Sequence, residues 1–89
     1  MTFGAWLRAR REAVNLPTLR ALQEQLEVAQ VHVSLAALSQ WELDKARPTD
    51  GNRAALWTVL GVHGELRRQV EIAFHGLGDF PPVRGGVAA

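Results

Sequence analysis

Residues 39–48 of the chain read SQWELDKARP, and this stretch carries the strongest local signals for the fold. It places the apolar Trp41 directly before the acidic Glu42, continues with two basic residues and stops at Pro48. An apolar side chain beside a charged one is typical of an amphipathic helix that packs on one side. Proline cannot continue a helix, so the stretch predicts the end of a helix followed by a short basic loop.

The residues before this stretch predict three helices. Serine and threonine side chains cap the free N–H groups of a helix start, and Thr2, Thr18 and Ser34 stand where such caps are needed. The first helix ends near Asn15 and Pro17, because a residue before proline is kept out of the α region. The helical spacing places these residues inward: Phe3, Trp6, Leu7, Arg10, Ala13 and Val14, then Leu19, Leu22 and Leu26, then Leu35, Leu38 and Trp41.

Residues 27–33, EVAQVHV, are ambiguous between helix, strand and turn. Val28, Val31 and Val33 are β-branched, which lowers helix propensity, but no neighbouring segment offers a pairing strand. We expect a long turn here, with or without a short helical or extended piece.

The residues after Pro48 predict two more helices and a tail. Thr49 or Asp50 caps the fourth helix, which ends at Gly61, and the fifth runs from about Gly64 to His75. We therefore expect an all-α domain over residues 1–76 and a Pro/Gly-rich tail over 77–89 that is mobile or packs as an arm. In the fourth helix the expected inner residues are Ala54, Leu56 or Trp57, and Leu60. In the fifth they are Leu66, Val70, either Ile72 or Ala73, and Phe74. All three tryptophans are expected to fill the core.

The composition sets limits on the function. A chain of 89 residues makes one domain, and the absence of cysteine excludes disulfides and thiolate metal sites. The net charge of +1 does not by itself indicate a nucleic-acid partner. No apolar run approaches the roughly 20 residues of a membrane span. The start, MTFGAWLRARRE, lacks the apolar core of a signal peptide, so we expect a cytoplasmic protein.

The sequence offers no pattern of an enzyme. His32, His63 and His75 lack the spacing of metal ligands, and the hydroxyl residues do not suggest a catalytic triad. No glycine-rich phosphate loop occurs. We therefore expect no catalytic residue, no metal and no cofactor.

Two motifs together resemble a known family. They are Phe3-Gly4-x-x-Leu7-Arg8-x-x-Arg11-Glu12 followed by Leu16, and Val33-Ser34-x-x-x-Leu38-Ser39-x-Trp41-Glu42 followed by Pro48. In this order they resemble the Cro/repressor-type helix-turn-helix DNA-binding family, whose lambda-repressor-like fold also occurs in xenobiotic-response-element-type regulators. The resemblance covers about residues 3–75.

The resemblance implies a fold, a function and an ion pair. It implies a five-helix lambda-repressor-like domain whose third helix enters the major groove of double-stranded DNA, as in a sequence-specific transcriptional repressor. It also implies a homodimer through the region of the fifth helix. Arg11 would pair with Glu42, and a guanidinium that meets a carboxylate bidentately fixes one helix on another.

The resemblance, together with side-chain chemistry, suggests which residues contact DNA. Gln40 can bond an adenine bidentately, whereas basic side chains after the third helix suit phosphates. The start of the second helix, with Thr18 and Arg20, also suits a phosphate. The full candidate set is Thr18, Arg20, Gln30, His32, Ser34, Ala37, Gln40, Lys45, Arg47 and Arg53.

Two features depart from the family pattern. The chain has several more residues than usual between Arg11 and Glu42. The surplus lies between Val28 and Ser34, as an elaborated turn, or earlier if residues 31–33 end the second helix. Apolar Leu35-Ala36-Ala37 also occupies the expected base-reading positions. A second hypothesis is therefore a protein-interaction module on the same fold, such as an antitoxin or an anti-repressor-like regulator with a regulatory protein partner.

Overall fold

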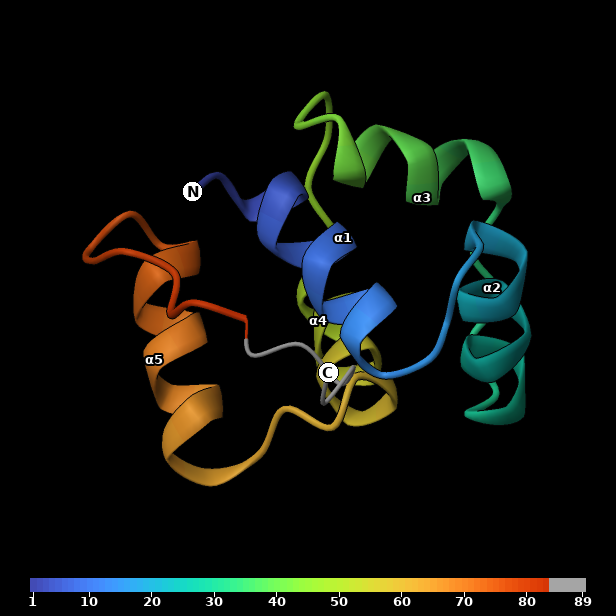
Figure 1. Cartoon of the computed structure of the whole chain (residues 1–89). Helices are drawn as coiled ribbons and strands as arrows, with labels where there is room; N and C mark the ends of the chain where they lie inside the picture. The colour runs from blue at the N-terminus through green and yellow to red at the C-terminus, as the bar shows by residue number, and fades with distance from the viewer. Residues whose placement is uncertain (84–89) are drawn as a thin grey trace.

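The computed structural model describes residues 1–83, and these form five helices and no strand (Figure 1). The all-α class predicted from the sequence is therefore confirmed. None of the helices within residues 1–83 is long and apolar enough to span a membrane. The helices are α1 (Phe3–Ala13), α2 (Leu19–Val28), α3 (Leu35–Glu42), α4 (Asp50–Val59) and α5 (Gly64–Phe74).

Hydroxyl side chains cap the first four of these helices. Each accepts a hydrogen bond from the backbone N–H three residues later, which satisfies one of the free donors of the first turn. The fourth cap is Thr49 and not Asp50. His63 precedes α5 and makes no side-chain capping bond. The capping hydroxyls are those of Thr2, Thr18, Ser34 and Thr49.

Each helix within residues 1–83 is followed, two positions after its last residue, by a residue with positive φ. The N–H of the following residue then donates to a carbonyl five positions earlier, as in the bond from Val31 to Leu26, which closes a Schellman motif. Glycine provides this conformation after α4 and α5, and polar residues provide it elsewhere. The five residues and their φ angles are Asn15 (64°), Gln30 (65°), Asp44 (59°), Gly61 (69°) and Gly76 (77°).

The ambiguous segment divides into a helix end and a turn. α2 continues to Val28, and residues 29–34 connect it to α3 without forming a strand. The connection runs back along α2, so that α3 begins beside the first half of that helix (Figure 1). The side-chain Nε2 of Gln23 in α2 donates to the carbonyl of Val33 at 3.0 Å and holds this return segment in place. The alternative in which residues 31–33 end α2 is therefore wrong.

The core lies where the inner faces of the helices meet. α3 packs against α1 and α2, and α2 packs against α4. All three tryptophans are buried, as expected, and Trp6 and Trp57 meet edge to face with ring centroids 5.6 Å apart. The buried core contains Phe3, Trp6, Leu7, Leu22, Leu26, Val33, Leu38, Trp41, Leu56, Trp57, Leu60, Val62, Val70 and Phe74.

One expected inner position is corrected, and one open alternative is decided. Ala54 is exposed, because the buried side of α4 is formed by Arg53, Leu56 and Trp57. Ala55, in contrast, is partly buried and packs against the core. In α5, Ala73 is the buried residue, while Ile72 remains 40% exposed.

The first part of the expected tail packs as an arm on α1. The Phe80 ring stacks on Trp6 with centroids 5.5 Å apart, and Val83 also lies against the core. An aromatic ring stacked on the core buries apolar surface that α1 alone would leave exposed. The rest of the expected tail, residues 84–89, lies outside the described residues.

Candidate nucleic-acid interface

A buried ion pair fixes α3 on α1. Arg11 Nε donates to Glu42 Oε2 at 2.7 Å, and Arg11 Nη2 donates to Glu42 Oε1 at 3.3 Å. The third nitrogen, Nη1, donates to the carbonyl of Leu16 at 2.7 Å, just after α1. The two side chains are only 5% and 9% exposed, so both charges depend on this geometry. The structure thus brings together the two residues that the family resemblance pairs.

Gly4 sets the distance between the same two helices. A Cβ atom at this position would lie 2.8 Å from the carbonyl oxygen of Trp41 and even closer to that of Glu42. The N–H of Gly4 donates to Asp44 Oδ1 at 2.8 Å, which connects the start of α1 to the loop after α3. Sequence reasoning treated Gly4 only as part of a motif and missed both of these roles.

The outward face of α3 differs from the expected one. Consecutive helical residues point about 100° apart, so Leu35, Ala36 and Ala37 cannot share one face. Leu35 and Ala37 pack toward the core, which removes Ala37 from the surface expected to meet DNA. Ala36 and Gln40 are exposed one turn apart, and Leu43, at the end of α3, is 61% exposed.

The starts of α2 and α3 lie side by side (Figure 1). Thr18 and Ser34 cap these two helices and remain exposed, and Arg20 projects from the first turn of α2. Lys45 is exposed in the loop after α3. Within residues 1–83, neither Arg20 nor Lys45 has a carboxylate within ion-pair distance. One of these two cations is therefore at the start of α2, beside the start of α3, and the other follows the end of α3.

The two candidates in the turn are also exposed. Gln30 has the positive φ of the turn that follows α2, and its side chain is exposed. The ring Nδ1 of His32 lies 4.0 Å from Glu27 Oε1 at the end of α2. Both side chains are therefore accessible to a partner that approaches the turn between α2 and α3.

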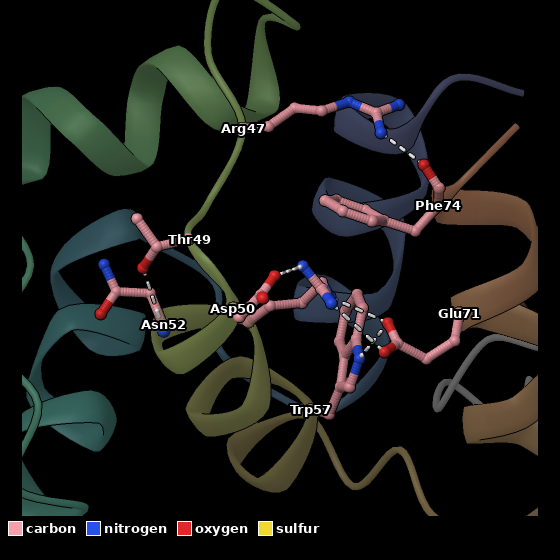
Figure 2. A network of polar contacts seen from close by, with 8 residues as sticks. Arg47, Thr49, Asp50, Asn52, Trp57, Glu71 and Phe74 are labelled. Carbon is pink, nitrogen blue, oxygen red and sulfur yellow. Dashed lines mark hydrogen bonds and ion pairs between the residues drawn. The ribbon is translucent and has the colours of Figure 1, made fainter.

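Arg53 is not at the surface, contrary to expectation. Only 8% of this residue is exposed, because its guanidinium belongs to a polar network between α4 and α5 (Figure 2). Arg53 Nε donates to Glu71 Oε2 at 2.8 Å, and Nη1 donates to Asp50 Oδ1 at 3.0 Å. The guanidinium carbon also lies 4.4 Å from the centroid of the Phe74 ring. These contacts remove Arg53 from the candidate phosphate contacts.

Arg47 contacts Phe74 at the end of α5. Its Nη1 donates to the backbone carbonyl of Phe74 at the end of α5, and its guanidinium carbon lies 4.5 Å from the ring centroid (Figure 2). A cation is favoured at a helix C-terminus, where the last carbonyls carry partial negative charge. Arg47 therefore connects the loop after α3 to α5. The residue remains exposed, and its role as a phosphate contact stays a prediction.

Glu71 lies at the centre of the α4–α5 network. It accepts hydrogen bonds from Arg53 and from Trp57 Nε1, the latter at 3.1 Å. Burial alone would raise the pKa of Glu71, but these hydrogen bonds outweigh burial and lower the pKa below its ordinary value. Burial would lower the pKa of Arg53, but its hydrogen bonds to Glu71 and Asp50 raise it instead. Both groups are therefore charged at neutral pH.

Among residues 1–83, no three histidine, aspartate or glutamate side chains come together as a metal site. Comparisons of the chain with family models, with curated proteins and with solved structures found no match. The candidate interface consists of the outward face of α3 and the exposed residues around it. These are Thr18, Arg20, Gln30, His32, Ser34, Ala36, Gln40, Leu43 and Lys45.

Proposed function

We propose that this chain is a sequence-specific DNA-binding transcriptional regulator, a dimeric repressor that places α3 in the major groove. The observation that carries the proposal is the arrangement of α3. It is fixed on α1 by Arg11 and Glu42, and it presents Gln40 to solvent. An amide on a rigidly held helix is suited to bidentate contact with an adenine. In this proposal the fold is a lambda-repressor-like helix-turn-helix domain.

The exposed cations around α3 support this proposal. Arg20, near the start of α2, and Lys45, after α3, have no acidic partner among residues 1–83. Phosphate contacts on either side of a recognition helix set its register without reading sequence. The net charge of only +1 leaves such local cations as the main electrostatic attraction.

The proposed dimer uses the region of α5. Ile72 and Leu77 are adjacent there, since the N–H of Leu77 donates to the carbonyl of Ile72, and they are 40% and 78% exposed. A second copy that covered them would bury apolar surface. A two-fold dimer would place two copies of α3 about one DNA turn, roughly 34 Å, apart, which suits an inverted-repeat operator.

The test is selection from a random duplex library on the purified protein, at about 0.15 M salt, followed by sequencing. Enrichment of an inverted repeat is the expected result, because it requires both sequence reading and a two-fold dimer. Enrichment of a single half-site would support DNA reading and contradict the dimer. No enrichment, with no salt-dependent retention of DNA, would refute DNA binding as the function.

A second candidate function is a protein-interaction module on the same fold. It is favoured by Leu43, an apolar side chain directly after α3 that is 61% exposed. Exposed apolar residues near a helix are more typical of a protein partner than of a phosphate backbone. The library selection separates the two functions, because a module that binds only protein retains no duplex.

A further inference from the structure

The side chains that α3 lacks indicate which base pairs this helix cannot read. Residues 35–42, LAALSQWE, contain no lysine or arginine, the residues that most often contact guanine O6 and N7. The only acid among them, Glu42, is engaged by Arg11 and cannot accept from cytosine N4. The two strongest ways to read a G·C pair are therefore absent from this helix.

The side chains that α3 presents are suited to A·T pairs. Gln40 is exposed, and its amide makes no hydrogen bond within residues 1–83, so its donor and acceptor are both free for adenine N7 and N6. Ala36 is exposed one turn earlier, and its methyl group can contact the 5-methyl group of thymine. The two residues are about 6 Å apart along the helix axis, or roughly two base-pair steps.

We propose that the operator half-site read by α3 consists of A·T pairs, with an adenine opposite Gln40 and a thymine whose methyl group touches Ala36. G·C pairs are disfavoured there because guanine lacks the adjacent acceptor and donor, N7 and N6, that an amide bonds bidentately on adenine, and because a G·C pair carries no 5-methyl group. The inference rests on the proposed function, since it names the class of DNA that the same surface binds.

The first experiment uses the operator obtained by selection. Binding of the full chain is measured while each thymine of the half-site is replaced by deoxyuridine, which removes only the methyl group. We expect one replacement to weaken binding about fourfold, the usual effect of one buried methyl group. In Ala36→Gly the same replacement should have no effect, and the comparison of thymine with uracil within one variant cancels any loss of folding.

The second experiment repeats the selection with Gln40→Arg. Arginine pairs with guanine, so the preferred adenine should be replaced by guanine at one position while the rest of the operator stays the same. In the original protein, replacing that A·T pair by G·C should weaken binding about tenfold or more. Gln25→Ala, which changes an exposed glutamine of α2, is the matched control and should leave the operator unchanged.

The outcomes separate this inference from the proposed function. An operator whose half-site contains A·T pairs, with the deoxyuridine effect and the switch to guanine, supports both. An operator with G·C pairs under α3, or one unaffected by deoxyuridine and by Gln40→Arg, overturns the inference and leaves DNA reading intact. Absence of any duplex binding overturns both.

Discussion

At the scale of single residues, Gly4 is the position where α1 and α3 come closest. A side-chain carbon there would meet the carbonyl oxygens of Trp41 and Glu42, which are backbone atoms that cannot rotate away. We expect Gly4→Ala to lower the free energy of unfolding by about 3 kcal/mol, because overpacking separates the helices. Urea denaturation followed by tryptophan fluorescence measures this change.

The matched control is Gly51 in the first turn of α4. A Cβ atom there would have no neighbour within 4 Å, and the residue is exposed. Gly51→Ala should therefore be neutral or stabilise the protein by up to about 1 kcal/mol through helix propensity. Equal effects of the two substitutions would show that the α1–α3 approach is not as tight as the structure indicates.

The Arg11–Glu42 pair gives a second prediction at this scale. Glu42→Ala leaves the buried Arg11 guanidinium without its carboxylate, and removing one partner of a buried pair costs about 3–5 kcal/mol. The double variant Arg11→Met, Glu42→Ala should be more stable than Glu42→Ala alone, because it leaves no unpaired charge. Thermal unfolding of the three proteins checks this order. The reverse order would mean that Arg11 is solvated in the folded state.

At the scale of elements, the α4–α5 network makes stability depend on pH. Because the pKa of Glu71 is lowered in the folded state, its ionised form contributes stability that is complete above the ordinary glutamate pKa of about 4.5. This contribution disappears as the pH falls through the lower folded pKa. The stability difference between the original chain and Glu71→Gln should therefore be large at pH 7 and shrink below about pH 4.

Glu65→Gln is the control for this experiment. Glu65 is on the same helix, its side chain is 69% exposed, and its nearest cation, Arg68, lies 3.8 Å away. Exposed pairs of this kind contribute little, so this variant should follow the original chain at every pH. A pH-independent difference for Glu71→Gln would mean that the carboxylate acts by packing and not by charge.

For the molecule as a whole, the net charge of +1 provides little overall attraction to DNA, so the affinity depends on where individual cations lie. If α3 meets DNA, Lys45→Ala should weaken binding to all duplexes and reduce the slope of log affinity against log salt by about 1. Arg67→Ala, which removes an exposed cation from α5, changes the net charge equally and should leave the slope unaltered. Filter binding or fluorescence anisotropy at several salt concentrations measures both slopes. Equal slope changes would indicate non-specific attraction.

The helix boundaries follow mostly from the sequence, because they depend on short-range contacts. Thr2, Thr18 and Ser34 bond to backbone groups only three residues away, so a local pattern is enough to find them. The C-terminal ends of α2 and α3 are harder to predict from the sequence. Gln30 and Asp44 have positive φ there, a conformation that sequence alone indicates mainly for glycine.

The five helices, the caps Thr2, Thr18 and Ser34, and the buried tryptophans can be predicted from the amino-acid sequence, since periodicity and capping are local. The burial of Arg53, in contrast, depends on how the helices pack. Arg53 and Lys45 are both cations near the loop between α3 and α4. Arg53 is buried because α5 packs beside α4 and brings Glu71, 18 residues away in the chain, within hydrogen-bonding distance of its guanidinium. Such pairings depend on how helices pack, and a linear pattern does not contain that information.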